Sequence, residues 1–204
     1  MRTDDTIALE RHALGTLNYI RRSIEAAGVL AVPGIAGVAM GIVGVAAALL
    51  SSMPTLRAHW LEIWLAAAVI AFVLGGVLMA REGAHRGLRL ARGPLRRFLL
   101  CLCPSLAAGA VLTAVLWHAG IPRLIPGTWL LLYGSAVLSA SAMISPTMVR
   151  QVGLMGGLFL LYGMVAFQLP LEWQSFVLGL GFGGLHIVFG LLIARASRSE
   201  AHDG

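Results

Sequence analysis

The sequence predicts an all-α, polytopic membrane protein built as a bundle of six transmembrane helices, and three observations support this fold class. Hydrophobic residues fill 58% of the 204 positions and charged residues only 12%, whereas about a quarter of a soluble domain is charged. The mean hydropathy is +0.86. Six apolar runs come close to the roughly 20 residues that a helix needs to cross the hydrocarbon core. A water-soluble domain is therefore excluded as the leading interpretation.

The six runs make up a predicted transmembrane domain over residues 29–195. Their helices are expected over residues 29–50, 60–80, 98–118, 127–144, 152–169 and 175–194. Glu62, at the start of the second run, is the only charged residue within them. Because short segments join the runs, consecutive helices are expected to be antiparallel neighbours. The remaining residues are too few for a separate ligand-binding module.

Residues 1–28 predict an amphipathic helix on the cytoplasmic surface of the membrane. Apolar residues recur there at intervals of three and four, which places them on one stripe of a helix. The stripe consists of Leu9, Ala13, Leu17, Ile20 and Ile24. The alternative is a helix that docks onto a partner protein. Residues 196–204 are predicted to be a cytoplasmic tail.

The distribution of arginine predicts the orientation of the helices. All 15 basic residues are arginine, and the formal net charge is +6. If both termini are cytoplasmic, only Arg57 and Arg123 lie outside, which is the positive-inside pattern. The tryptophans then fall at the outer ends of helices, where indole rings favour the headgroup layer. They are Trp60, Trp64, Trp117, Trp129 and Trp173.

The segment between the second and third runs, residues 81–97, holds six arginines and one glutamate. Basic segments next to spanning helices are attracted to anionic headgroups on the cytoplasmic side. The bilayer and its anionic lipids are therefore the expected partners, and no nucleic acid is expected. The predicted lipid-contacting residues are Arg86, Arg89, Arg92, Arg96 and Arg97.

His186 is the one ionisable side chain expected at mid-depth of a span, and such residues are functional candidates because they are expensive there. On an α-helix Gly179, Gly183 and Gly190 share its face. In one hypothesis these glycines admit a neighbouring helix and His186 forms a hydrogen bond across that contact. In the other, they line a cavity in which His186 contacts a ligand or passes a proton. A cavity of at least a few hundred Å³ that reaches His186 would favour the second hypothesis, and a helix packed directly across Gly179, Gly183 and Gly190 would exclude it.

The cavity hypothesis names four ligand-binding residues. Gly183 and His186 come from the sixth span, and Tyr133 and Ser139 come from the fourth, where serines form either a polar path or a close helix contact. Small residues also predict tight packing of the first span and of the fifth, the latter at Gly153 and Gly157. The glycines of the first span are Gly34, Gly37, Gly41 and Gly44.

A second constellation is expected at the outer rim, where two imidazoles and two carboxylates suit a divalent transition metal. Its residues are His59, Glu62, His118 and Glu172. The alternative is that these side chains simply face water. A haem with two axial histidines is disfavoured because His118 and His186 differ in depth. No cofactor is therefore expected, and the motifs GxSxG and HExxH and paired carboxylates are absent.

Three hypotheses for function follow. The first is a non-enzymatic membrane module that acts by helix packing, with itself as a homo-oligomer or with a membrane partner. The second is a small permease or ligand-binding protein with an intramembrane cavity near His186. The third is a metal-dependent or haem-dependent membrane enzyme.

Two stretches carry a resemblance to other proteins. They are ERHALGTLNYIRRSIEAAG running into AVPGIAGVAMG, over residues 10–41, and GFGGLHIVFGLLIAR, over residues 181–195. In these stretches the chain resembles an uncharacterised group of six-span bacterial inner-membrane proteins to which no function is assigned. The resemblance implies a multi-pass protein of a bacterial inner membrane, and it implies no activity and no site residues.

Overall fold

The structure is a computed structural model that describes residues 15–17, 32–85, 94–142, 144 and 146–202. Of the predicted surface helix over residues 1–28, only residues 15–17 are described, and these three are helical. The rest of that prediction lies outside the described residues. The same holds for three of the predicted lipid-contacting residues, Arg86, Arg89 and Arg92.

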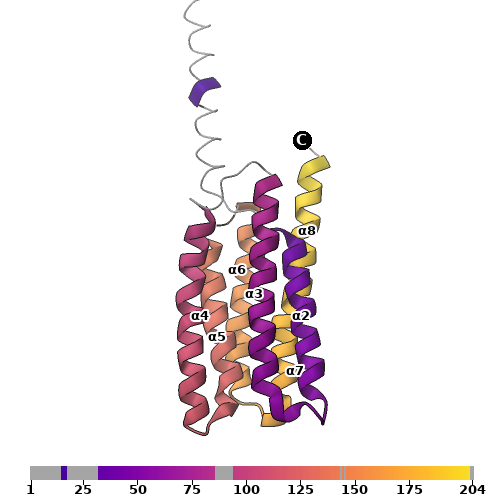
Figure 1. Ribbon diagram of the computed structural model, residues 1–204. Helices are drawn as coiled ribbons and strands as arrows, with labels where there is room; N and C mark the ends of the chain where they lie inside the picture. Colours follow the sequence, from indigo (N-terminus) through magenta and orange to yellow (C-terminus); the bar gives the residue numbers. More distant parts are fainter. Residues whose placement is uncertain (1–14, 18–31, 86–93, 143, 145, 203–204) are drawn as a thin grey trace, which may run out of the picture.

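Six helices in the described part are long and apolar enough to cross a membrane, and they form the predicted all-α bundle (Figure 1). The first five are α2 (Gly34–Ser52), α3 (Trp60–His85), α4 (Pro94–His118), α5 (Ile125–Ser141) and α6 (Pro146–Ala166). The sixth is composite: α7 (Gln174–Leu178), the π-helical segment η5 (Gly179–Leu185) and α8 (His186–His202). Because α8 continues to His202, most of the predicted tail is part of this helix.

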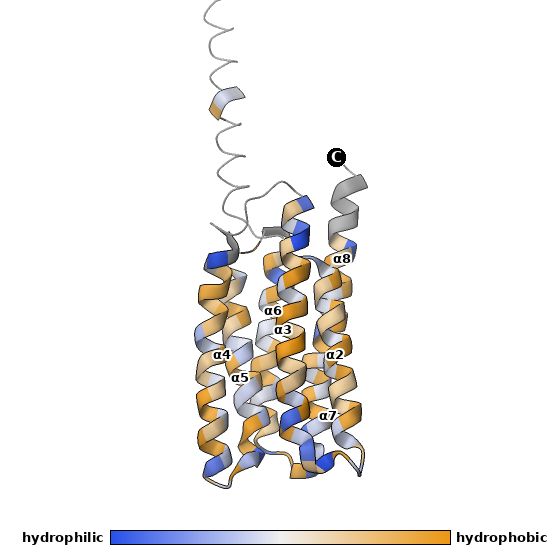
Figure 2. Ribbon diagram, viewed as in Figure 1, coloured by the Kyte–Doolittle hydropathy of each residue, from blue (hydrophilic) through white to orange (hydrophobic). Residues whose placement is uncertain are grey.

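Polar turns close the end of the bundle that lies opposite the end of α8. Short 3-10 segments there lead into α3, α5 and α7, and they are η1 (Arg57–His59), η3 (Pro122–Leu124) and η4 (Leu171–Trp173). Between the two ends the surface is apolar (Figure 2). On α2, for example, the side chains of Ile35, Ile42 and Leu49 are about three-fifths exposed. Apolar side chains facing outward between polar ends are typical of a multi-pass membrane protein.

The helices are arranged as an incomplete ring. α2 packs along α3 on one side and along the sixth helix on the other, while α5 packs along α6 and α4. Contacts of α6 with α7, η5 and α8 join these two sets of three helices. In the described residues α3 and α4 make little contact with each other. The ring is therefore open along one seam, between α3 and α4.

Glycines bring α2 and the sixth helix into backbone contact, as the first of the two hypotheses for His186 expected. A Cβ atom at Gly190 would lie 2.6 Å from the backbone nitrogen of Val38 and 2.7 Å from the carbonyl oxygen of Gly34. At Gly44 it would lie 2.8 Å from the backbone nitrogen of Gly183. Only hydrogen fits at these positions, because the two backbones touch there, as is common between membrane helices.

A second glycine contact holds α5 against α6. A Cβ atom at Gly134 would lie 2.9 Å from the carbonyl oxygen of Gly156, and one at Gly156 would lie 2.9 Å from the backbone nitrogen of Leu138. The glycines predicted for this role on α6 do not fill it. Gly153 has only side-chain atoms at 3.8 Å or more, and Gly157 has no such atom within 4 Å.

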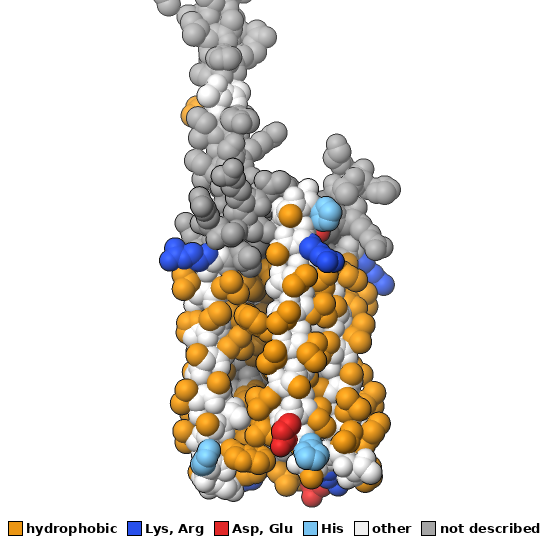
Figure 3. Space-filling view, viewed as in Figure 1, with side chains coloured by type: hydrophobic (Ala, Val, Ile, Leu, Met, Phe, Trp, Pro, Cys, Tyr) orange, Lys and Arg blue, Asp and Glu red, His pale blue; other side chains and the backbone are white. Residues whose placement is uncertain are grey.

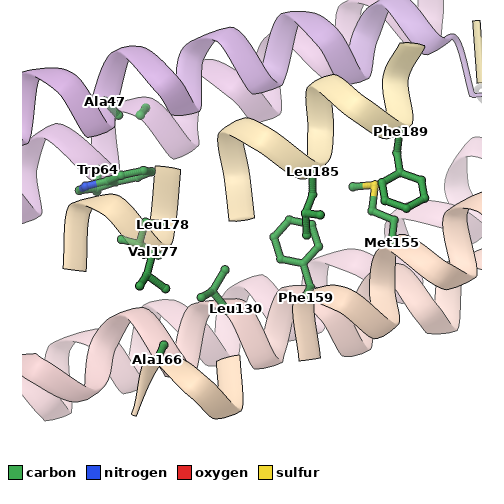
Figure 4. Packing of buried hydrophobic residues seen from close by; sticks show 11 residues of the cluster. Ala47, Trp64, Leu130, Met155, Phe159, Ala166, Val177, Leu178, Leu185 and Phe189 are labelled. Carbon is green, nitrogen blue, oxygen red and sulfur yellow. The ribbon is translucent and has the colours of Figure 1, made fainter. Parts of the chain in front are cut away.

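The core lies where the sixth helix meets α5 and α6. The side chains of Phe159 and Leu178 are fully buried, and Phe159 faces Leu185 (Figure 4). Trp64 belongs to this core with 3% of its surface exposed, so its placement in the headgroup layer was wrong. Its indole Nε1 donates a hydrogen bond to Oγ of Ser51, at 3.1 Å. Because that hydroxyl is also 2.8 Å from Oγ of Ser175, Trp64 completes a polar contact among three helices.

Candidate functional site

A cavity of about 430 Å³ opens at the seam between α3 and α4. Figure 3 shows the face of the bundle on which it opens, with α4 on the left and α3 in the centre. Residues 64–72 of α3 and residues 102–113 of α4 contribute the two walls, and α2, α5 and η5 contribute the back. The cavity is wide because the two walls make little contact with each other.

A smaller cavity of about 130 Å³ lies along the same seam, toward the end of the bundle at which α2 begins. Five residues line both cavities: Met40, Phe72, Leu102, Tyr133 and His186. The two cavities are therefore neighbours, and Tyr133 and His186 stand at their junction. These are the two residues of the sequence-predicted ligand set that line either cavity.

Tyr133 of α5 and His186 of α8 form a buried hydrogen-bonded pair. The tyrosine hydroxyl oxygen lies 2.7 Å from Nε2 of the imidazole, and only 4% of the surface of His186 is exposed. The other ring nitrogen, Nδ1, is buried and forms no hydrogen bond of ordinary geometry with a described residue, although the carbonyl groups of Gly181 and Phe182 face the ring. The pair therefore has hydrogen-bonding capacity that the fold does not use.

Aromatic rings hold the pair in place. The ring of Tyr133 lies 4.9 Å from that of Phe159 and 5.2 Å from that of Phe182, both edge-on. The imidazole of His186 lies 5.5 Å from the ring of Phe159 and 6.3 Å from that of Phe182. Edge-on aromatic contacts fix ring orientation. The polar atoms of the pair are thereby set in an otherwise apolar site.

The π-helical segment η5 turns the side chain of His186 away from the face that Gly183 presents to α2. A π-helical turn has hydrogen bonds from residue i to i+5, so it contains more residues than an α-helical turn and shifts the faces that follow it. The carbonyl oxygen of His186 still lies against α2, where a Cβ atom at Gly37 would be 3.2 Å away. Its side chain reaches away from α2, to Tyr133 on α5.

The other two predicted ligand-binding residues lie elsewhere. Gly183 faces α2, where a Cβ atom would meet the side chain of Val45 at 2.8 Å. Ser139 is exposed on the surface of α5 and lines neither cavity. The two hypotheses for His186 are therefore not exclusive in this structure, because the glycines pack directly on α2 while a cavity reaches His186 from another side.

Sequence reasoning missed the residues that line the end of the cavity opposite His186. Trp129 donates a hydrogen bond from Nε1 to Oγ1 of Thr113, at 2.7 Å, and so joins α5 to α4. Trp60 stacks on Trp129, with ring centroids 6.0 Å apart and planes at 12°. The tryptophans were assigned to the headgroup layer, although Trp117 and Trp173 alone are about half exposed. The signal in the sequence was Thr113, a hydroxyl residue on the neighbouring span that could accept a hydrogen bond from the indole of Trp129.

The predicted metal site is not assembled. Nδ1 of His59 lies 3.9 Å from Oε1 of Glu62, and both side chains are about two-thirds exposed. Nδ1 of His118 lies instead 2.7 Å from the carbonyl oxygen of Ala114 on its own helix. In the described part of the chain, which includes Glu172, no three histidine, cysteine or acidic residues are grouped for a metal.

The predicted lipid-contacting arginines are described only in part. Arg96 is exposed near the start of α4. That end of α4 lies on the side of the bundle at which α8 ends (Figure 1). Arg97 lies in the same helix, and its side chain is outside the described residues. The contact with anionic lipid stays a prediction.

No family model, curated protein or solved structure matches the chain. The resemblance of residues 10–41 and 181–195 to a group of bacterial membrane proteins stays a prediction.

Proposed function

We propose that this protein is a non-enzymatic membrane protein that binds a lipophilic small molecule in the cavity between α3 and α4. The observation that carries the proposal is the 430 Å³ cavity with the Tyr133–His186 pair on its wall. Its volume lies within the range of about 300–1,000 Å³ that is typical of ligand sites. Such sites are mainly apolar with a few fixed polar groups, which is the composition found at this seam.

The position of the opening supports entry from the bilayer. Exposed apolar side chains flank the seam, including Val69 and Phe72 of α3 and Leu106 of α4. In a membrane such side chains face lipid, so a molecule dissolved in the hydrocarbon layer reaches the cavity without crossing water. A small permease is the second candidate, since the two adjoining cavities extend the site along the seam.

The helix-packing hypothesis loses most of its motivation. The glycine faces of α2, the sixth helix and α5 that suggested a homo-oligomer or a membrane partner are occupied inside this chain, by the contacts of Gly34 with Gly190 and of Gly134 with Gly156, whereas Gly157 of α6 meets no neighbouring helix in the described residues. A face that is filled within the chain is not free for a second protein. Ligand binding is therefore the better supported function.

Photolabelling tests the proposal. A long-chain alcohol that carries a diazirine is added to vesicles with the purified protein, and labelled peptides are mapped with and without excess unlabelled alcohol. Saturable labelling is expected at the cavity walls. Ala71→Phe and Ala110→Phe, which place rings in the cavity, are expected to reduce it at least about tenfold, the effect of about 1.4 kcal/mol in binding.

Two matched variants control for the added ring. Ala66→Phe and Ala107→Phe lie on the exposed surfaces of the same helices and do not line the cavity. They are expected to leave saturable labelling unchanged. Labelling that is never saturable, or that all four variants reduce equally, would refute ligand binding in the cavity. Uptake of the labelled alcohol through the protein, absent in the Ala71→Phe variant, would instead favour the permease.

We further propose that the chain lies in a bacterial inner membrane with both termini in the cytoplasm. The support is the arginine distribution, since 13 of the 15 arginines then lie inside. In a background with Cys101→Ser and Cys103→Ser, Thr55→Cys is expected to react with an impermeant maleimide on intact cells. His85→Cys, at the opposite end of α3, is expected to react only after permeabilisation. The reverse result would invert the proposed orientation.

A further inference from the structure

The cavity walls also indicate the chemical class of the ligand. Resting on the proposed function, we propose that the site takes a lipid-soluble quinone and its quinol, with the ring beside Tyr133 and His186 and the tail in the seam. Three independent properties of the site carry this inference: the charge of its walls, their aromatic content and the chemistry of the polar pair.

The walls are uncharged. Among the described residues that line the two cavities there is no arginine, aspartate or glutamate. A phosphate or carboxylate headgroup placed there would be an unpaired charge in a low-dielectric site, which is strongly unfavourable. A phospholipid or fatty acid therefore does not fit with its headgroup at His186. A neutral ligand does.

Aromatic side chains line the larger cavity from the Tyr133–His186 pair to its opposite end. Trp64, Phe72, Trp129 and Phe182 line it together with Tyr133. Aromatic rings prefer stacked or edge-on contacts with other rings, which favours a planar ring over a flexible chain as the buried group. An engineered apolar cavity of about 150 Å³ holds one benzene, so about 430 Å³ accommodates a substituted ring and the start of a tail.

The Tyr133–His186 hydrogen bond matches both redox forms of such a ring. If Nε2 of His186 carries the proton, it donates to the tyrosine oxygen, and the tyrosine O–H is free to donate to a quinone carbonyl. If Nδ1 carries the proton, the tyrosine O–H donates to Nε2, and the tyrosine oxygen accepts a hydrogen bond from a quinol hydroxyl. Nδ1 forms no hydrogen bond of ordinary geometry to a described residue that would fix one tautomer, although the carbonyl groups of Gly181 and Phe182, which face the ring, would accept a hydrogen bond from a proton held on Nδ1.

The open seam suits the rest of the molecule. Membrane quinones carry a long apolar tail, and the cavity opens sideways between α3 and α4 along exposed apolar side chains. A ring at Tyr133 therefore leaves its tail in contact with lipid. The ordering entropy of the tail is then largely avoided, because only the ring becomes immobilised.

Displacement of the diazirine alcohol tests the ligand class. The competitors are a benzoquinone with a ten-carbon tail, its quinol, and an alkylbenzene with the same tail and no oxygen atoms. The quinone and the quinol are expected to displace the probe at concentrations within about threefold of each other. Both concentrations are expected to be about tenfold below that of the alkylbenzene, as for a ligand hydrogen bond.

Tyr133→Phe removes the hydroxyl and is expected to abolish the advantage of quinone and quinol over alkylbenzene. Tyr162→Phe, on α6 and lining neither cavity, is the matched control and is expected to preserve it. If alkylbenzene displaces the probe as well as the quinone in the parent protein, the quinone proposal fails while the binding function stands. If none of the three competitors displaces a saturable signal, the quinone proposal also fails, and only labelling that is not saturable would refute the binding function.

Discussion

Replacing Gly190 with leucine is expected to destabilise the bundle strongly. The new Cβ atom alone would lie 2.6 Å from a backbone nitrogen of α2. A side chain could relieve such a contact by changing its rotamer, but backbone atoms cannot. The sixth helix and α2 must therefore move apart. We expect a loss of about 3 kcal/mol in the free energy of unfolding, the upper end of the usual range for overpacking.

The measurement is unfolding by sodium dodecyl sulfate in mild-detergent micelles, followed by circular dichroism and by tryptophan fluorescence. Gly157→Leu is the control, because no atom beyond its own helix lies within 4 Å of the added Cβ position. Leucine also has a higher helix propensity than glycine, by up to about 1 kcal/mol. We therefore expect the control to be neutral or slightly more stable. Equal destabilisation by both variants would show that contact with α2 is not the cause.

Phe159→Ala is the second substitution with a large expected effect. Phe159 is fully buried, and its ring contacts Tyr133, Phe182 and His186. In soluble cores this change costs about 3–5 kcal/mol. Lipid tails are as apolar as the protein core, so the part of this cost that comes from transferring the ring out of water is small here. The cost of the cavity and of the lost packing contacts remains. We expect a loss of about 2–3 kcal/mol in the free energy of unfolding.

The same variant is expected to weaken saturable photolabelling, because the rings that orient the polar pair lose their support. Phe176→Ala is the control, since that side chain is 54% exposed and contacts only the ring of Trp173 among the described aromatic pairs. It is expected to change neither stability nor labelling measurably. A Phe159→Ala protein of parental stability would contradict the assignment of this residue to the core.

Much of the architecture could be predicted because the bilayer imposes it. A span needs a long apolar run, so six runs predicted six helices, and the structure has them. The glycine stripe of α2 likewise predicted a close contact, since membrane helices associate through small residues. On α6 the same reasoning selected Gly153 and Gly157, whereas Gly156 makes the contact. Small residues on several faces of one helix do not show which face is used.

The open seam and η5 could not be predicted. Residues on the core-facing and the lipid-facing sides of α3 and α4 are both largely apolar, so no periodicity indicates which faces remain apart. The glycine-rich run over residues 179–185 predicted close packing, but composition does not distinguish a π-helical turn from an α-helical one. An α-helical register placed Gly183 and His186 on one face, and the structure separates them.

The outer-rim constellation shows the limit of topology alone. His59, Glu62, His118 and Glu172 do lie at one end of the bundle, because alternating helix directions place them there. A metal ion needs its ligands within about 2–2.5 Å of its centre. The alternating directions of the helices show only which end of the bundle a residue lies at, and they do not show which side chains meet there. For Tyr133 and His186, the sequence could predict that the two residues lie at similar depth in the membrane, but it could not predict the hydrogen bond between them.

The incomplete ring has a mechanical consequence. Each of its two sets of three helices contains one glycine-locked pair, α2 with the sixth helix in one and α5 with α6 in the other. The sets meet along α6 and the sixth helix, across the bundle from the seam (Figure 1). A small rotation about that line would change the width of the seam and leave both locked pairs intact. If each set of three helices moves as one rigid unit, a larger ligand is expected to rotate the two sets apart and to widen the seam.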